Sequence, residues 1–160
     1  MPEKNTIERA RKDKARGKSA STQAGEFVRE EMHHVREGKH GARSPQQAIA
    51  IGLSKARRAG VDLPPPRNGK AETKRAAASA IARRGRKTNP KRSRATRGAL
   101  AREGQAAATT RALSRQGRTA AARRSASDRS AAAKRAARTK GPRVRSQAAK
   151  KAARTRKSHT

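Results

Sequence analysis

The stretch Ser130-Ala-Ala-Ala-Lys-Arg-Ala-Ala-Arg-Thr-Lys140 typifies the second half of the chain, which is built mostly from Ala, Arg, Lys, Ser and Thr. Residues 61–160 contain 30 of the 44 Lys and Arg residues but only four acidic residues, so they carry +26 of the formal net charge of +33. After the proline run, the large apolar residues there are Ile81, Leu100, Leu113 and Val144. Since so few apolar side chains cannot offset the conformational entropy lost on ordering, we predict that residues 71–160 form a disordered or transiently helical cationic tail.

The tail contains an internal repeat. The quoted stretch recurs at residues 146–156, where eight of eleven positions are identical. Ala and Arg are good helix formers, so these pieces are candidates for transient helices, which neutralisation by phosphate would favour. Drift of a low-complexity sequence explains the repeat equally well.

Composition also limits the class of protein. The chain has no cysteine, so disulfide and thiol chemistry are excluded. No apolar run approaches the roughly 20 residues of a membrane span, and the first residues lack the apolar core of a signal peptide. We therefore expect a cytoplasmic protein without membrane insertion. No constellation of catalytic residues is present, so we expect neither an enzyme nor a cofactor.

Residues 1–19 are predicted to form a basic N-terminal helix, with Asn5 as its cap and Glu8 three positions later. A second helix is predicted over 22–37, capped by Ser21 or Thr22 and ended by Gly38. Its apolar residues recur at spacings of three and four, so they share a face. The charged residues, Glu26, Arg29, Glu30, Glu31 and Arg36, are placed on the other face.

The clearest helix start is Ser44-Pro45-Gln46-Gln47, where an N-cap serine, a first-turn proline and a capping-box glutamine coincide. This helix should run to Arg58 and end at Gly60. Residues 20–63 are thus predicted to form a helical hairpin, followed by a Pro-rich linker at 64–70. The fold class is mainly α, a small hairpin with a long tail. The predicted hairpin core is Phe27, Val28, Met32, Val35, Ile49 and Leu53, with Ile51, Val61 and Leu63 in support.

His33, His34 and His40 lie near two acidic residues, Glu30 and Glu37, which raises the question of a metal site. Adjacent histidines on a helix point about 100° apart and do not converge on one ion. We therefore expect solvated histidines near a helix end and no metal.

Two segments are similar to DNA-binding motifs. Arg83-Arg84-Gly85-Arg86-Lys87 is similar to the core of an AT-hook but lacks the proline that follows it, so a plain basic linker is favoured. The segment from Ala48 to Ser54 matches the turn of a helix-turn-helix. Arg58 stands where that motif needs an apolar residue, so one unbroken helix is favoured.

The segment Ser21–Arg43 and the stretch Gln47-Ala-Ile-Ala-Ile-Gly-Leu-Ser-Lys-Ala-Arg-Arg-Ala-Gly60 resemble a family of small basic bacterial proteins. The family is classed as a domain of unknown function, and some members are labelled plasmid stabilisation protein. The resemblance covers about residues 1–66 and implies a bacterial origin, without an activity or functional residues. In composition, the tail is similar to the arms of bacterial linker-histone-like proteins.

These patterns favour non-sequence-specific binding of double-stranded DNA, with histone-like compaction or protection at the nucleoid. The hairpin, residues 20–63, would supply a homodimer contact or bind a protein partner. RNA or ribosome association is an alternative, as is an adaptor whose tail is only an electrostatic anchor; a sequence-reading regulator ranks third. The predicted nucleic-acid-binding residues are Arg83, Arg84, Arg86, Lys87, Lys91, Arg92, Arg94, Lys134, Arg135, Lys150 and Lys151.

Overall fold

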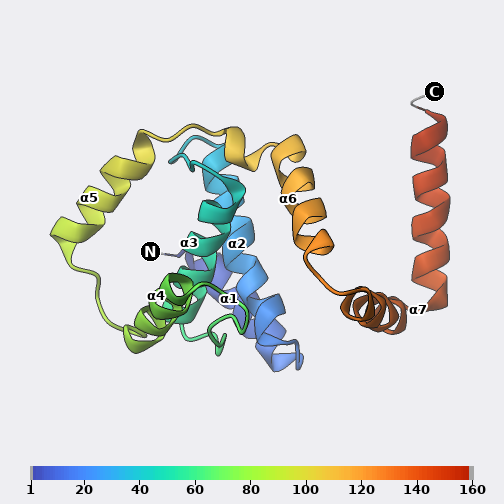
Figure 1. Cartoon of the computed structure of the whole chain (residues 1–160), viewed down its shortest axis with the longest axis horizontal. Helices are drawn as coiled ribbons and strands as arrows, with labels where there is room; N and C mark the ends of the chain where they lie inside the picture. The colour runs from blue at the N-terminus through green and yellow to red at the C-terminus, as the bar shows by residue number, and fades with distance from the viewer. Residues whose placement is uncertain (1, 159–160) are drawn as a thin grey trace. The chain divides into compact units, whose positions relative to one another are not determined.

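The computed structural model describes residues 2–158, so Met1 and the last two residues of the predicted tail lie outside it. Helices follow one another along this range (Figure 1). The chain divides into two compact units, Met1–Gln116 and Gly117–Thr160. The helices are α1 (Lys4–Ala15), α2 (Ala20–Arg36), α3 (Pro45–Arg58), α4 (Ala71–Ala82), α5 (Pro90–Ala101), the 3-10 turn η1 (Ala106–Ala108), α6 (Thr110–Ala122) and α7 (Ala126–Lys157).

The prediction of a disordered tail after a short hairpin is wrong, because residues 71–157 contain four α-helices and a 3-10 turn. An α-helix satisfies its backbone hydrogen bonds locally, and Ala, Arg and Lys favour it without large apolar side chains. Side-chain N-caps stabilise the first turns of two of these helices. Asn89 accepts hydrogen bonds from two backbone amides of α5, and Ser125 accepts one from the amide of Asp128 in α7. The prediction allowed only transient helices there, because it gave the scarcity of large apolar residues more weight than this helix propensity and the local caps.

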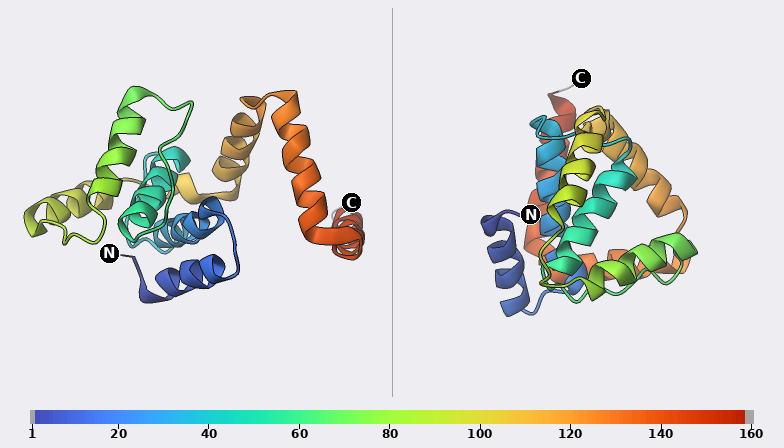
Figure 2. Two further views of the ribbon diagram at one scale, coloured as in Figure 1. Left: turned by 90° about the horizontal axis from the view of Figure 1, so that it is seen from below. Right: turned by 90° about the vertical axis from the view of Figure 1, so that its left-hand side faces the viewer.

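Helices α2 and α3 form the centre of the first unit and lie side by side (Figure 2). Along α2, Phe27 and Val35 are fully buried and Met32 is nearly so. Along α3 the buried positions are Ala48, Gly52 and Ala56, spaced by four, together with Arg57. Ile49, Ile51 and Leu53 are only partly buried, and so is Val28 of α2. The predicted core is therefore correct for Phe27, Met32 and Val35 of α2, whereas on α3 small residues take the central positions because the two backbones approach closely.

The helix ends agree with the predictions in part. Ser44 caps α3 as predicted, accepting from the Gln47 amide at 3.2 Å, and α3 ends at Arg58. The cap of α2 is Ser19, not Ser21 or Thr22. Asn5 does not cap α1, which begins at Lys4 after Glu3. Ala10 of α1 is buried in one apolar cluster with Ala24, Phe27, Ala56 and Val61.

Later segments complete this unit. Ala77 and Ala80 of α4 are buried, and α4 contacts α3. Ala107 and Ala108 of η1 join a second apolar cluster, which contains Met32, Val35, Ala42 and Ala48. The loop after α2 is attached to the end of α5 and the segment that follows it, since the amides of Gly41 and Ala42 donate to the carbonyls of Leu100 and Gly104 at 2.9 and 3.0 Å. Part of the predicted tail therefore belongs to the core of the hairpin unit.

The second unit is dominated by α7, which bends at Gly141 (Figure 2). This glycine has φ +66°, a left-handed conformation that residues with a Cβ rarely adopt, and Pro142 follows it. The internal repeat of the sequence falls within this helix. Its two copies, residues 130–140 and 146–156, lie one on each side of the bend.

Candidate nucleic-acid interface

The cationic residues at the end of α4 are exposed, but they are not equivalent. Arg83, Arg86 and Lys87 extend into solvent, whereas Arg84 donates to Asp62 at 2.6 Å. This hydrogen bond, together with the charge of Arg84, lowers the pKa of the Asp62 carboxyl below its ordinary value. The amide of Gly85 donates to the carbonyl of Arg58 in α3 at 3.1 Å, so the loop is attached to the hairpin. Arg84 thus holds the loop while its neighbours face solvent.

Helix α5 presents cations around its circumference. It begins where Asn89 Oδ1 accepts from the amides of Lys91 and Arg92, with Pro90 in the first turn. Lys91, Arg92 and Arg94 are exposed, and no residue of α5 is buried. Because successive residues of an α-helix are turned by about 100°, these side chains point in different directions. The helix can therefore meet phosphates from more than one side.

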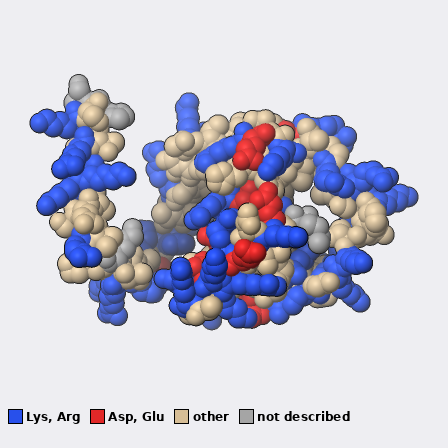
Figure 3. All heavy atoms as spheres, turned by 180° about the vertical axis from the view of Figure 1, so that it is seen from behind, with Lys and Arg blue, Asp and Glu red and all other residues tan. Residues whose placement is uncertain are grey.

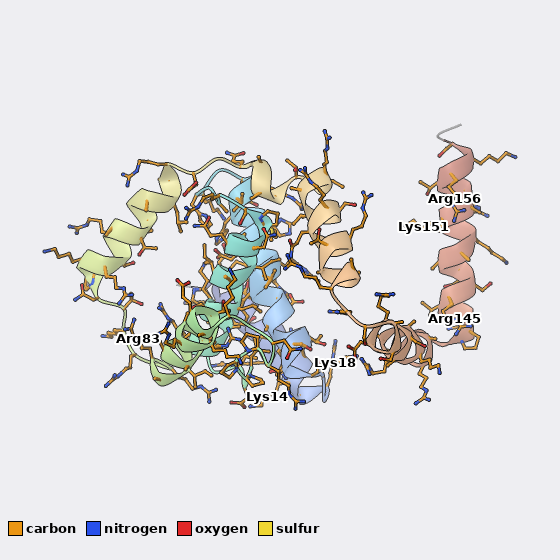
Figure 4. All side chains as sticks on the ribbon, viewed as in Figure 1. Lys14, Lys18, Arg83, Arg145, Lys151 and Arg156 are labelled. Atoms are coloured by element: carbon orange, nitrogen blue, oxygen red, sulfur yellow. The ribbon has the colours of Figure 1, made fainter. Side chains whose placement is uncertain are left out.

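Helix α7 arranges its cations more regularly. Lys134, Arg135 and Arg138 lie within an arc of about 100° around the helix axis, and all three are exposed. The repeat places Lys150, Lys151 and Arg154 in the same way beyond the bend, again exposed. Arg138 and Arg154 were not among the predicted binding residues, although their spacing of four from Lys134 and Lys150 indicates the shared face. Figure 4 labels Arg145, Lys151 and Arg156 along the second half of this helix.

The charge of the second unit cannot be neutralised within it. Residues 117–160 contain 15 Lys and Arg residues and one acidic residue, Asp128. In Figure 3 the acidic side chains gather over the central part of the face shown, while α7, at the left, is mostly basic and neutral. Such an excess of one charge attracts a polyanion strongly at low salt.

The predicted residues do not form one cluster. The seven from Arg83 to Arg94 belong to the first unit and the four from Lys134 to Lys151 to the second. One cation has a different role that the sequence analysis missed. Arg57 is buried and donates to the carbonyls of Leu63 and Pro64, both at 3.1 Å, and burial lowers its pKa. It fixes the proline-rich linker to the end of α3.

Residues 11–67 match a protein family described as Family of unknown function (DUF6496). The matched range runs from the middle of α1 through α2 and α3 to the linker, so it covers the hairpin and none of the later helices. No curated protein and no solved structure matches the chain. Within residues 2–158, none of the helices has the length and apolar character needed to cross a bilayer.

Proposed function

We propose that this protein binds double-stranded DNA without sequence preference, through phosphate contacts made by the cationic helices α5 and α7. The observation that carries the proposal is the repeated arrangement on α7, where each half has three exposed cations within an arc of about 100°. An α-helix fits the major groove of B-DNA, which is about 12 Å wide, so cations on it can reach phosphates at the groove edges.

Base recognition is not expected. The only aromatic residue, Phe27, is 1% exposed inside the hairpin, so the protein offers no aromatic surface on which bases could stack. The exposed cations of α7 alternate with Ala, Ser and Thr. Lys and Arg contacts to phosphate determine affinity but carry no sequence information. Charge neutralisation of this kind would support histone-like compaction or protection of DNA at a bacterial nucleoid.

Binding of the full chain to fluorescent duplexes tests the proposal. Two unrelated duplex sequences of equal length should bind with the same affinity. A variant with Lys134, Arg135, Arg138, Lys150, Lys151 and Arg154 changed to Gln should bind about 1,000-fold more weakly or worse at ~0.1 M salt, because up to six phosphate contacts are lost.

A matched control distinguishes a DNA-binding interface on α7 from general attraction between the protein's net charge and DNA. Changing six exposed cations at the N-terminus to Gln removes the same charge: Lys4, Arg11, Lys12, Lys14, Arg16 and Lys18. This control should bind much more tightly than the α7 variant. Equal losses in the two variants would contradict an interface on α7. Tighter binding of structured RNA than of duplex DNA at the same salt would favour RNA as the partner.

A further inference from the structure

Three side chains at the end of α2 converge where the sequence analysis predicted only solvated histidines. Glu31 and His34 lie one turn apart on α2, and His40 follows in the next loop. Gly38, with φ +73°, lets the chain turn back after the helix. One ligand atom from each residue lies within 4.8 Å of the other two. The side chain of Glu31 is fully buried, and those of His34 and His40 are 12% and 16% exposed.

One oxygen of Glu31 has no hydrogen-bond partner. Lys55 Nζ donates to Oε1, whereas Oε2 is buried and receives no hydrogen bond. The nearest polar group identified is Nε2 of His40, at 3.4 Å. A buried carboxylate oxygen that receives no hydrogen bond is unfavourable, so a cation bound at Oε2 would satisfy it.

Hydrogen bonds to residues other than Glu31 orient the rings of both histidines. Nδ1 of His40 lies 3.0 Å from the carbonyl oxygen of Gly41, which can only accept, so Nδ1 carries the hydrogen. In the neutral ring, the lone pair of Nε2 then faces Oε2 of Glu31, and two electron-rich atoms repel each other. Nε2 of His34 donates in the same way to Glu3 Oε1 at 3.0 Å, and Nδ1 lies 3.8 Å from Glu31 Oε1. Histidines that bind metals usually have their other nitrogen held by a carboxylate or carbonyl.

The surrounding charges accommodate a dication. With both histidines neutral, the ion-pair network linked to these residues contains four carboxylates and two lysines, which leaves −2: Glu3, Glu30, Glu31, Glu37, Lys39 and Lys55. Lys55 binds the other oxygen of Glu31, so it leaves Oε2 available.

One of the three donor distances already matches a tetrahedral site, and the ligand atoms all lie within 4.8 Å of one another. Donors around a tetrahedral zinc are roughly 3.3 Å apart, and the Glu31–His40 distance is 3.4 Å. The rings of His34 and His40 are nearly perpendicular, at 84°, with centroids 5.8 Å apart. Two imidazoles on one zinc have centroids roughly 5 Å apart, so small side-chain rotations bring them into place.

We propose that Glu31, His34 and His40 bind one divalent transition metal ion, with a fourth position for water. Two imidazoles and a carboxylate favour zinc over magnesium or calcium, which prefer oxygen ligands. The ion would fix the loop that carries Gly41 and Ala42, which hold the segment after α5. The proposal is independent of DNA binding.

Titration of the metal-free full chain with zinc, against a chromophoric zinc chelator, tests the site. Wild-type protein should bind one zinc ion tightly, and His34→Gln and His40→Gln should each weaken binding by about 100-fold or more. His33→Gln is the matched control, because His33 is adjacent in sequence but exposed, and its affinity should be unchanged. Equal losses in all three variants, or no saturable binding, would overturn the proposal.

Cobalt(II) gives a readout that does not depend on variants folding. Wild-type protein loaded with cobalt should show the intense visible absorption of a four-coordinate site, and added zinc should abolish it. The weak spectrum of six-coordinate cobalt would overturn the proposed geometry. Zinc should also raise the thermal midpoint of the wild-type chain and of His33→Gln, and not that of His40→Gln, because a ligand that binds the folded state stabilises it.

Discussion

Gly52 of α3 lies directly against the backbone of Val28 in α2, so that a Cβ built on the glycine would stand 2.7 Å from the Val28 Cα and 2.9 Å from its nitrogen. Real Cβ atoms do not approach backbone so closely. The contact lies at the middle of the stripe Ala48, Gly52 and Ala56, where the two helices of the hairpin meet. The absence of a side chain at position 52 therefore sets the distance between α2 and α3.

Gly52→Ala should destabilise the protein, because the helices must separate to admit the methyl group. We expect a loss of about 1–3 kcal/mol in the free energy of unfolding, measured by urea denaturation. Gly25→Ala is the matched control: Gly25 is exposed on α2, and its Cβ would meet nothing within 4 Å. It should gain up to about 1 kcal/mol from helix propensity. If both variants behaved alike, the close approach would be wrong.

Gly41→Ala should release the segment after α5 from the hairpin. A Cβ at Gly41 would overlap the backbone carbonyl of Glu103, and backbone cannot move aside as a flexible side chain does. In the Gly41→Ala variant, hydrogen exchange of the Ala42 amide should therefore be faster than in the wild type, because that amide donates to the Gly104 carbonyl. Gly104→Ala meets nothing within 4 Å and should leave that exchange slow. Unchanged protection in Gly41→Ala would argue against this docking.

Arg57→Ala should weaken the attachment of the proline-rich linker. The buried guanidinium donates to the carbonyls of Leu63 and Pro64, and a hydrogen bond from a charged group typically contributes about 1.5–3 kcal/mol net of competition with water. We expect a net loss of about 1–3 kcal/mol in unfolding free energy. Arg11→Ala, at an exposed position of α1, should change it by less than about 0.5 kcal/mol. Equal effects would show that charge, not the carbonyl contacts, matters at Arg57.

Asp62 should titrate below its ordinary pKa of about 3.9, because Arg84 donates to its carboxylate and carries a positive charge. A folded-state pKa below the unfolded value means that the interaction stabilises the fold at neutral pH. That contribution is lost as pH falls through the folded pKa. Carbon NMR of the Asp62 carboxyl group measures this directly. Arg84→Gln should raise the pKa, and Lys14→Gln should raise it less, since Lys14 lies 3.9 Å away. A pKa at or above the ordinary value would contradict the pair.

Features that depend on neighbouring residues could be predicted from the sequence. Ser44, Pro45 and Gln47 define the start of α3 through hydrogen bonds within one turn, and the structure has that cap. The periodicity of Phe27 and Val35 likewise placed them on one face of α2. Glu31 has the same spacing, four residues from each, but its charge led to its assignment to the solvent face. It is buried because Lys55 from α3 pairs with it.

Features that depend on the meeting of distant segments could not be predicted. Helix α4 and the turn η1 pack against the hairpin and bury four alanines: Ala77, Ala80, Ala107 and Ala108. In so alanine-rich a sequence, the spacing of alanines does not indicate which of them are buried. The approach of His40 to Glu31 depends on the turn at Gly38. The expectation of a disordered or only transiently helical tail failed for a related reason, since it gave apolar burial more weight than the helix propensity of Ala, Arg and Lys.

The salt dependence of DNA binding by the full chain decides whether the cationic helices contact phosphates broadly. If about ten Lys and Arg residues each neutralise one phosphate, log K against log salt concentration should fall with a slope of about −9 on any duplex sequence. Fluorescence anisotropy across a range of salt concentrations gives this slope. A slope shallower than about −3 would contradict the proposed function.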